Sequence, residues 1–349
     1  MVNLAASYAR SIHVSPNGSD GADGSSQHPL LTIDAALQQA QPGDSVLLHG
    51  GVYLIEESIR FPRSGEPDNW IELKAAPGER PVIDGKNLTH HGPSDRPFHR
   101  AKEGLITIEN VAYIRLDGIE VSNSHGIGIL VIDREKKGQT HHVELVRCRT
   151  RESFGSGIAV WYSDTVEVHQ CTITGANRIY LAIGPWTRRD TYHEALTLAG
   201  ATRFAVHHNT ISDCDKEGID CKEVSRDGVI HHNVVHNLKR QGIYLDSWFG
   251  ELKNVDVYSN VVYDCEWGIA LSAEGEGSSM SNISIHGNLL FENRGSGILF
   301  GVWNRDQPRR AIRIFNNTIL SNGEARHWAG LTGGIDLRCK GILVRHRRI

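Results

Sequence analysis

The sequence of 349 residues lacks the features that mark several classes of protein. No apolar stretch approaches the roughly 20 residues that a membrane-spanning helix needs, so we expect no membrane partner. The net charge is −4 and no basic run precedes the last residues, which argues against a nucleic-acid partner. Residues 1–11 lack a positive segment followed by a long apolar core, and we expect them to form a leader outside the folded domain.

Cysteine is also sparse, with six residues scattered along the chain and none in a C-x-x-C pair. That spacing argues against a zinc site built from cysteines. We expect most of the six to be buried free thiols, Cys221 among them, with a disulfide between Cys148 and Cys171 as the alternative. Cysteine usage therefore leaves the cellular compartment open.

What the sequence does contain is a short motif that returns at intervals near two dozen residues. A glycine is followed by alternating apolar residues, and the steps between glycines are 24 (218 to 242), 26 (242 to 268) and 29 (268 to 297). A second motif, out of phase with the first, ends in Asn209, Asn233, Asn260, Asn288 and Asn317. Alternation with period two and enrichment in Ile, Val and Tyr indicate strands. Stacked coils of such strands predict an all-β fold, a single-stranded parallel β-helix.

A stacked fold places equivalent residues of successive repeats in columns. The apolar residues one and three positions after each glycine should point inward: Ile158 and Val160, Ile219 and Cys221, Ile243 and Leu245, Ile269 and Leu271, Ile298 and Phe300. A segment with Ala195 at the glycine position fits the same frame. The asparagines should form a turn ladder, in the left-handed conformation and with their side chains bonded to backbone amides.

The N-terminal part contains the clearest helix signal. In residues 31–40, Thr32 can act as the N-cap, and four apolar residues share one face: Ile33, Ala36, Leu37 and Ala40. Because an exposed sheet edge invites aggregation, we expect this helix to cap the open end of a β-helix domain over residues 12–349. Residues 333–337 fit another strand of the glycine series, after which we expect either truncation or a basic tail that blunts the edge.

Five segments resemble the opening of the pectin-lyase-like right-handed parallel β-helix proteins: residues 15–20 (SPNGSD), 29–33 (PLLTI), 41–46 (QPGDSV), 51–53 (GVY) and 81–85 (PVIDG). With the asparagine-marked repeats, the resemblance extends over nearly the whole chain. It implies a right-handed coil and a secreted or periplasmic carbohydrate-active protein. That superfamily holds polysaccharide lyases, inverting glycoside hydrolases, uronan epimerases, esterases and phage tailspikes, so the fold does not decide the activity.

The outward columns predict a charged patch on one sheet. Adjacent coils lie about 4.8 Å apart, and alternate residues of a strand lie about 6.8 Å apart. Five charged residues therefore fall on three neighbouring coils: Glu194, Glu217, Asp220, Lys222 and Asp246. Side chains from the same columns should frame this patch as substrate-binding residues: Tyr244, Trp248, Glu274, Trp303 and Trp161.

Like charges on stacked strands repel, so four acids beside one lysine need something that uses or neutralises them. One interpretation is a solvated, salt-bridged face in which Lys222 pairs with Asp246 and Asp220. The other is a carbohydrate groove in which exposed tryptophans stack on sugar rings. Packing of these tryptophans under loops is the alternative to that role.

An insert over residues 176–192 lengthens one coil to 38 residues (157 to 195). We expect it to wall the groove, with Arg188 and Arg189 holding carboxylate or sulfate groups of an acidic glycan, although an ordinary surface loop is the alternative. His193 joins the substrate-binding residues because it adjoins Glu194. The histidine pairs at 141–142, 207–208 and 231–232 lie away from the patch, and we expect no metal site there.

The favoured function is cleavage of a uronic-acid-containing polysaccharide by a lyase. In β-elimination a cation neutralises the uronate carboxylate and a base removes the C5 proton, and oxygen-rich clusters suit Ca²⁺. Residues 216–220 resemble the Asp-Asp-Gly-x-Asp segment of family nine pectate lyases, which implies a Ca²⁺ site at Glu194, Glu217 and Asp220.

The chain departs from that pattern in two places. Lys216 replaces the first Asp of the segment, and Tyr244 or Ala270 stands where the family has its catalytic lysine. Lys222 is the nearest available base, provided that burial or a cation lowers its pKa.

Two other functions stay open. An inverting hydrolase uses two carboxyls about 6.5–9.5 Å apart, a spacing that Glu217 or Asp220 could meet with Asp246, with Lys222 tuning one of them. In a non-catalytic glycan-binding or tailspike-like protein, the acidic patch would be incidental. In every case we expect a polysaccharide or oligosaccharide partner and a monomeric protein.

Overall fold

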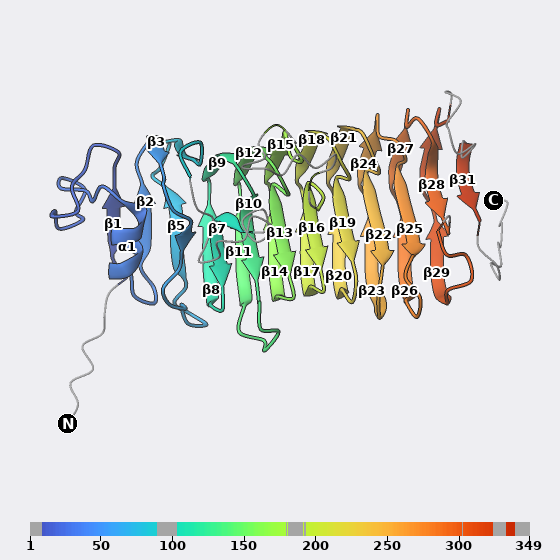
Figure 1. The fold of residues 1–349 in the computed structure, drawn as a ribbon, viewed down its shortest axis with the longest axis horizontal. Coiled ribbons are helices and arrows are strands. Elements are labelled where there is room, and N and C mark those ends of the chain that lie inside the picture. Colours follow the sequence, from blue (N-terminus) through green and yellow to red (C-terminus); the bar gives the residue numbers. More distant parts are fainter. Residues whose placement is uncertain are drawn as a thin grey trace.

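The computed structural model describes residues 9–88, 103–178, 180, 191, 193–301, 303–323 and 333–338. Its coils stack in sequence order along one long axis, from the N-terminal end to the C-terminal end (Figure 1). The pairings between strands are parallel, and the strands form three sheets of 11, 10 and 10 members. The predicted all-β parallel β-helix is confirmed.

Each sheet takes one strand from nearly every coil. In order, the first sheet contains β1 (Ser11–Val14), β2 (Ser45–Leu48), β5 (Ile71–Ala75), β8 (Ala112–Asp117), β11 (His141–Val146), β14 (Asp164–His169), β17 (Thr202–His207), β20 (Arg226–His231), β23 (Glu251–Tyr258), β26 (Ser279–His286) and β29 (Arg309–Phe315). The second contains β4 (Ile59–Arg60), β7 (Gly104–Glu109), β10 (Ile127–Ile132), β13 (Ile158–Trp161), β16 (Leu196–Ala199), β19 (Ile219–Lys222), β22 (Ile243–Ser247), β25 (Ile269–Ala273), β28 (Ser296–Phe300) and β31 (Gly333–Leu337). The third contains β3 (Gly51–Leu54), β6 (Pro81–Asp84), β9 (Glu120–Ser124), β12 (Arg149–Ser153), β15 (Thr172–Thr174), β18 (Thr210–Cys214), β21 (Val234–Leu238), β24 (Val261–Tyr263), β27 (Leu289–Phe291) and β30 (Thr318–Leu320).

The interior of the coil is built from the predicted apolar columns. In the second sheet, Ile219 pairs with Ile243 and Ile243 with Ile269, and these side chains are fully buried. Leu196 lies in the same column, so the frame with Ala195 at the glycine position is also confirmed. Each fully buried side chain of this kind contributes about 1.5–3 kcal/mol, which makes the stacked columns the main source of stability.

Helix α1 (Ile33–Gln39) covers the N-terminal end of the coil, as predicted (Figure 1). The Thr32 side chain accepts a hydrogen bond from the Ala35 amide at 3.2 Å and so acts as the N-cap. Strand β1 starts at Ser11, and Arg10 forms an ion pair with Asp44 at 3.0 Å. The folded part therefore begins slightly before residue 12.

The asparagine ladder forms, but not in the backbone conformation that we expected. The amide of Asn209 donates to Asn233 Oδ1 at 3.0 Å, and the amide of Asn233 donates to Asn260 Oδ1 at 3.0 Å. The left-handed residue of each turn is instead the one before the asparagine, such as His208 (φ 56°) and His232 (φ 54°). Placing the turn one residue earlier directs the asparagine side chain into the coil, where it satisfies buried backbone groups.

The described cysteines are buried free thiols: Cys148, Cys171, Cys214, Cys221 and Cys265. The disulfide alternative for Cys148 and Cys171 is therefore wrong, whereas Cys339 lies outside the described residues. Strand β31 pairs with β28, which confirms the strand predicted at residues 333–337. Within the described ranges, no helix has the length and apolar character required to cross a membrane.

Candidate functional site in the second sheet

Strands β16, β19 and β22 place the predicted charged residues on three adjacent coils. Thr197 pairs with Asp220 and Asp220 with Tyr244, whereas Ala199 pairs with Lys222 and Lys222 with Asp246. The turn residues before these strands align in the same way, because the Ala195 amide donates to the Glu217 carbonyl at 2.8 Å. The columns derived from the sequence are confirmed, and we call their charged residues the acidic cluster: Glu194, Glu217, Asp220, Lys222 and Asp246.

The acidic cluster is buried, which contradicts the solvated face that was one of the two interpretations of the sequence. The exposed fractions are 6% for Glu194, 3% for Glu217, 1% for Asp220 and 3% for Asp246. A carboxylate out of contact with water needs a partner charge, a hydrogen-bond donor or a proton. The cluster therefore has to be explained by its internal contacts rather than by solvation.

Lys222 is the cation at the centre of the acidic cluster. Its Nζ atom lies 2.7 Å from Glu194 Oε2 and 2.7 Å from Asp220 Oδ2. The predicted ion pair with Asp246 is wrong, although the pair with Asp220 is confirmed. Thr197 Oγ1 also donates to Glu194 Oε2 at 3.1 Å, so this carboxylate has two donors.

The charges around Lys222 oppose the role of general base that the sequence suggested. Burial lowers the pKa of Lys222, but the negative charges of Asp220 and Glu194 outweigh burial and raise that pKa well above its usual value. Burial raises the pKa of Glu194, but the positive charge of Lys222 lowers it below its ordinary range. In this arrangement Lys222 is an ammonium ion and Glu194 its carboxylate partner.

The pKa values of the other acids of the cluster are raised. Burial, followed by the charge of Asp246, raises the pKa of Asp220 well above its usual value, despite the opposing effect of Lys222. Burial also raises the pKa of Asp246, again against the charge of Lys222. Burial and the charge of Glu194 raise the pKa of Glu217. Carboxyls with lowered and with raised pKa values therefore lie side by side, a frequent property of acid–base sites.

Three carboxylate oxygens of the cluster are buried without a hydrogen-bond partner: Glu217 Oε2, Asp220 Oδ1 and Asp246 Oδ1. Such hard oxygens have the chemistry that Ca²⁺ prefers. Their positions fit less well, because no three ligand atoms of the cluster lie within 4.8 Å of one another in the described ranges. The ammonium group of Lys222 already lies between Glu194 and Asp220 and supplies the positive charge there.

The aromatic residues do not frame an open groove as predicted. Tyr244 is 5% exposed, packs with Trp267 and Trp303, and donates a hydrogen bond to Glu274. Trp303 is only partly buried in that group. Trp161 packs in a separate buried cluster that includes Ile127 and Leu130. Packing against strand β10 thus accounts for Trp161, whose predicted exposure is wrong, as it is for Tyr244.

Trp248 is the exposed aromatic residue of the predicted set, with 57% of its surface accessible. It directly follows the last residue of β22 and so lies two residues beyond Asp246. Because a sugar ring can stack only on an accessible aromatic face, Trp248 is the member of the set best placed to meet a glycan.

The insert is only partly described. His193 packs against Trp161 with the rings tilted at 58° and their centroids 4.6 Å apart, and its charge lowers the pKa of Glu194. Arg178 pairs with Asp215 at 2.8 Å rather than pointing to a ligand. Arg188 and Arg189 lie outside the described residues.

Two neighbours of the cluster were not singled out from the sequence. Arg240 Nε lies 3.1 Å from Glu217 Oε1. The adjacent Gln241 is fully buried, and neither atom of its side-chain amide has a hydrogen-bond partner. Gln241 occupies the same column as Glu217 and precedes a glycine, so its position in the repeat could have identified it as a neighbour of the cluster.

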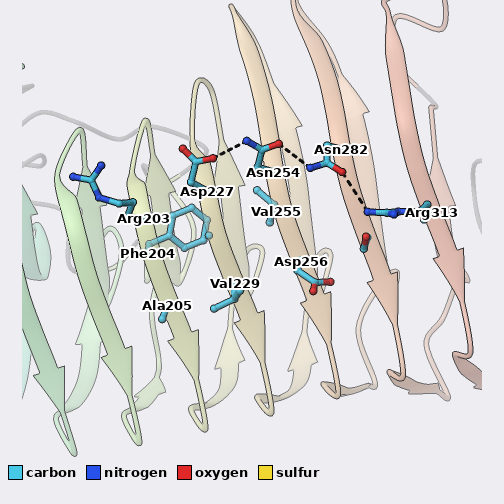
Figure 2. A pocket seen from close by; sticks show the side chains of 12 residues that line it. Arg203, Phe204, Ala205, Asp227, Val229, Asn254, Val255, Asp256, Asn282 and Arg313 are labelled. Atoms are coloured by element: carbon cyan, nitrogen blue, oxygen red, sulfur yellow. Dashed lines mark hydrogen bonds between the residues drawn. The ribbon is translucent and has the colours of Figure 1, made fainter.

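A second hollow lies on the outer face of the first sheet, away from the acidic cluster (Figure 2). There Asn254 Nδ2 donates to Asp227 Oδ1 at 2.6 Å, and Asn282 Nδ2 donates to Asn254 Oδ1 at 2.8 Å. Arg313 extends the row with a hydrogen bond to Asn282 Oδ1 at 3.3 Å. Because these side chains satisfy one another's hydrogen-bonding groups, we do not place the active site there.

Two family models match the chain. A model described as "Pel9A-like, right handed beta helix region" matches residues 12–174, and one described as "Right handed beta helix region" matches residues 104–280. The second match covers half of the chain and includes the acidic cluster.

Curated relatives share limited stretches with this chain. Pectate lyase PEL9 of Emericella nidulans is 31% identical over 150 residues, which are 43% of this chain and 35% of that protein. The uncharacterized protein YwoF of Bacillus subtilis is 23% identical over 356 residues, or 93% of this chain and 70% of the relative. The chain thus spans about a third of the length of PEL9.

Solved structures show the same fold at low sequence identity. Pectate lyase Pel9A has a TM-score of 0.60 at 15% identity and covers 93% of this chain and 82% of its own. Alginate lyase from Paenibacillus has a TM-score of 0.57 at 14% identity, with coverage of 88% and 99%. A lacto-N-biosidase from Eubacterium ramulus has a TM-score of 0.57 at 12% identity, with coverage of 95% and 68%. The repeat motif, the sheet topology and the family models agree with one another. The chain belongs to the right-handed β-helix family of the pectin-lyase-like superfamily.

Proposed function

We propose that this protein is a polysaccharide lyase that cleaves an acidic, uronic-acid-containing glycan at the acidic cluster. The observation that carries the proposal is the coexistence of a protonated Lys222, an ionised Glu194 and carboxyls with raised pKa values in one buried group. The names of two partial relatives, pectate lyase PEL9 and pectate lyase L of Thermoclostridium stercorarium, support the same class. Because polymeric glycans lie outside the cell, we expect a secreted or periplasmic enzyme.

The residues of the cluster have distinct roles in this proposal. The ammonium of Lys222 neutralises the carboxylate of a bound uronate, which makes the C5 proton easier to remove. Glu217, with a raised pKa and one unpaired oxygen, accepts that proton. Asp246, whose pKa is raised by burial, donates a proton to the departing oxygen, and Asp220 holds Lys222 in place.

Access to these groups requires a local opening, because the carboxyls are almost fully buried. A glycan approaching along the second sheet meets the exposed Trp248 first. We propose that Trp248 stacks on a sugar ring outside the cluster while the covering residues move aside.

Calcium belongs to the proposal as a ligand of the acidic cluster. The unpaired oxygens of Glu217, Asp220 and Asp246 favour a hard divalent cation, and Glu194 would join them if Lys222 moved away. When bound, Ca²⁺ would supply positive charge for the substrate carboxylate. The distances within the cluster require a rearrangement before it can bind an ion.

Inverting hydrolysis is the second candidate, and the raised pKa of Asp246 favours it. A protonated Asp246 can act as general acid, and Glu217 or Asp220 can activate water. Asp220 and Asp246 lie two residues along and one coil apart, which gives a separation of roughly 8 Å between their backbones. Inversion requires about 6.5–9.5 Å between the carboxyl groups themselves.

A screen of acidic polysaccharides with two readouts tests the proposal. Lyase action yields an unsaturated uronate with ultraviolet absorbance, whereas hydrolysis yields only new reducing ends. The screen is run with and without EDTA, and with Asp246→Asn as a negative control. Reducing ends without ultraviolet absorbance would favour hydrolysis, and glycan binding without either product would favour a binding protein. Activity that survives EDTA would remove calcium from the proposal.

A further inference from the structure

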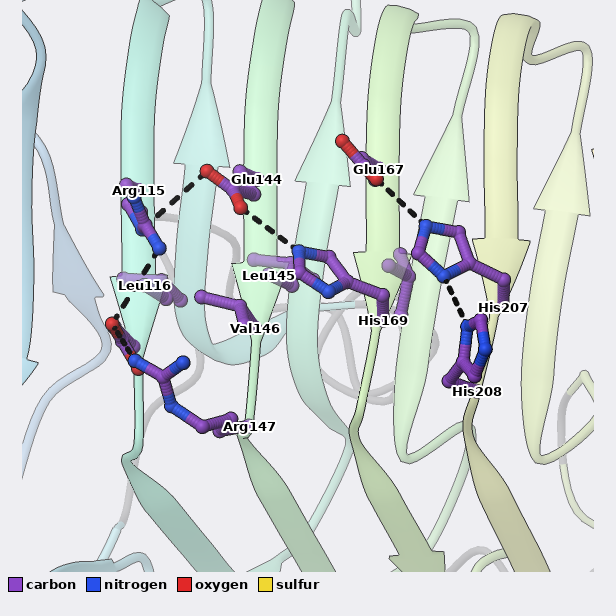
Figure 3. A network of polar contacts seen from close by, with 12 residues as sticks. Arg115, Leu116, Glu144, Leu145, Val146, Arg147, Glu167, His169, His207 and His208 are labelled. Carbon is purple, nitrogen blue, oxygen red and sulfur yellow. Dashed lines mark hydrogen bonds and ion pairs between the residues drawn. The ribbon is translucent and has the colours of Figure 1, made fainter. Parts of the chain in front are cut away.

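A run of acidic and histidine side chains crosses the outer face of the first sheet on strands β11, β14 and β17 (Figure 3). Glu144 pairs with Glu167 in one column, and His169 pairs with His207 two residues farther along. His169 Nε2 lies 2.8 Å from Glu144 Oε1, and His207 Nε2 lies 2.7 Å from Glu167 Oε1. We call these four residues the acid–histidine column. Each acid thus contacts the histidine of the next coil.

We propose that Glu167, His169 and His207 form a binding site for a divalent transition-metal ion of the zinc type. One ligand atom from each of the three residues lies within 4.8 Å of the other two. Two imidazoles and one carboxylate suit Zn²⁺, Co²⁺, Ni²⁺ or Cu²⁺ rather than Ca²⁺. The sequence predicted no metal site at these histidines.

The two imidazoles are held in position before any ion binds. His169 stacks on His207 with ring centroids 4.9 Å apart and planes at 20°, and His207 stacks on His231 at 4.8 Å and 3°. The side chains of His169 and His207 are 15% and 17% exposed, whereas that of Glu167 is 48% exposed. The rings are therefore ordered, and an ion can approach from the side of Glu167.

Neighbouring groups can set the ring tautomers that a metal requires. Glu144 contacts one nitrogen of His169, and His208 Nδ1 lies 2.8 Å from His207 Nδ1 (Figure 3). When one ring nitrogen donates a hydrogen bond, the other nitrogen keeps a lone pair that can bind a metal. Metal-binding histidines are oriented in this way. Arg115 Nε lies 3.4 Å from the second oxygen of Glu144, which fixes that carboxylate in turn.

The geometry needs only a small adjustment to bind an ion. A tetrahedral zinc ion at about 2.0–2.1 Å from its ligands holds them roughly 3.3 Å apart, so the three atoms must draw together by no more than about 1.5 Å. Glu167 has the freedom to move because it is half exposed. The ion would replace the direct contact between Glu167 and His207 and link the coils of β14 and β17.

The same sheet contains a matched control in Asp256 and His286. His286 Nε2 lies 3.0 Å from Asp256 Oδ1, with the same diagonal arrangement between adjacent coils. The ring neighbours of His286 are Tyr258 and Phe315, and among the residues that the structure describes no second imidazole completes a metal site there. This pair should not bind the ion, although it has the same surface chemistry.

Titration calorimetry with Zn²⁺ tests the site, on EDTA-treated and dialysed full-length protein without a histidine tag, at pH 7.5. We expect one equivalent of Zn²⁺ to bind and to raise the melting temperature. His169→Gln and His207→Gln should each weaken binding by about 10–100-fold or more, whereas His286→Gln should not change it. Glu167→Gln, on a half-exposed side chain, provides a ligand variant that does not depend on the ring stack.

Three results would overturn the proposal: no Zn²⁺ binding by the wild type at millimolar concentration, binding that survives His169→Gln and His207→Gln, or equal weakening by His286→Gln. Ca²⁺ at the same concentration should not compete for this site. Polysaccharide cleavage by His207→Gln should equal that of the wild type, because the acidic cluster lies on another sheet. Failure of this proposal therefore differs from failure of the proposed function.

Discussion

The acidic cluster and the acid–histidine column both join ionisable side chains of adjacent coils, and they differ in burial. In the column each acid contacts a histidine two residues farther along on the next coil, whereas Lys222 contacts Asp220 on its own strand and Glu194 on the preceding coil. The carboxyls of the cluster are at most 6% exposed, and three of their oxygens lack a hydrogen-bond partner. In the column, Glu144 and Glu167 each contact a histidine, and the side chain of Glu167 is 48% exposed.

The two regions respond to pH in opposite ways, because burial disfavours the charged form of an acid in one and of a base in the other. Burial raises the pKa of Asp246, so the folded state holds a proton that the unfolded state releases, and acidification stabilises this part of the fold. His231 continues the histidine stack, and burial together with the charges of His207 and His232 lowers its pKa to about 4. At this site the unfolded state binds a proton that the folded state does not bind, so acidification destabilises the folded state. Burial of an acid therefore gives a proton-storing site in one sheet, and burial of a base gives a proton-excluding stack in the other.

The largest effect is expected from Lys222→Met in the acidic cluster. The variant leaves Glu194 and Asp220 buried without their cation, and breaking a buried ion pair typically costs about 3–5 kcal/mol. We expect a loss of that size in the free energy of unfolding, measured by urea denaturation, together with loss of cleavage. A solvated, salt-bridged face would lose only about 0–1 kcal/mol, so burial makes the expected loss larger.

Lys239→Met is the matched control for Lys222→Met. The side chain of Lys239 is 71% exposed and pairs with Asp215 at 2.8 Å, so its loss should cost about 0–1 kcal/mol. Equal stability of the two variants would show that the buried pairs around Lys222 contribute no more than surface pairs.

An intermediate effect is expected from Asp246→Asn. Asparagine has the shape of a protonated aspartate, and Asp246 has no ion pair to lose, so the free energy of unfolding should change by about 1 kcal/mol or less. Turnover of the substrate should fall by about 10²-fold or more, since loss of a general acid typically costs that much. Steady-state kinetics measures this, with Asp256→Asn on the first sheet as control. Full turnover by Asp246→Asn would place the chemistry elsewhere on the coil.

The smallest effect is expected from His231→Gln, as a change in pH dependence. The pKa of His231 is about 4 in the folded state, below its unfolded value of 6.5, so wild-type stability falls as the pH drops from 6.5 towards 4. Glutamine does not titrate, and the fall in melting temperature over this interval should shrink by about 1–3 °C. Thermal scans at pH 7 and pH 4.5 measure it. An unchanged difference between the two scans would mean that His231 does not exclude the proton.

The sequence already determined the repeat, the columns and their alignment. Period-two alternation with glycine and asparagine at fixed places specifies which residues of a coil face inward, and parallel pairing then places Lys222 beside Asp246. The capping helix was predictable for the same reason, because its signal at Thr32 is local. These features depend only on neighbouring residues and on the stacking of one repeat upon the next.

Only the tertiary structure decided the burial of the second sheet and the partners of Lys222. Backbone alignment brings Lys222 and Asp246 onto adjacent coils, but the side chain reaches Glu194 and Asp220 instead, a choice made by side-chain direction and local charge. The meeting of His169 and His207 was hidden for another reason: they are separated by a coil lengthened by the insert at 176–192. Burial and long-range contact sum over many distant residues, whereas a sequence pattern reports only local periodicity, and for that reason the fold was predictable and the chemistry of both sites was not.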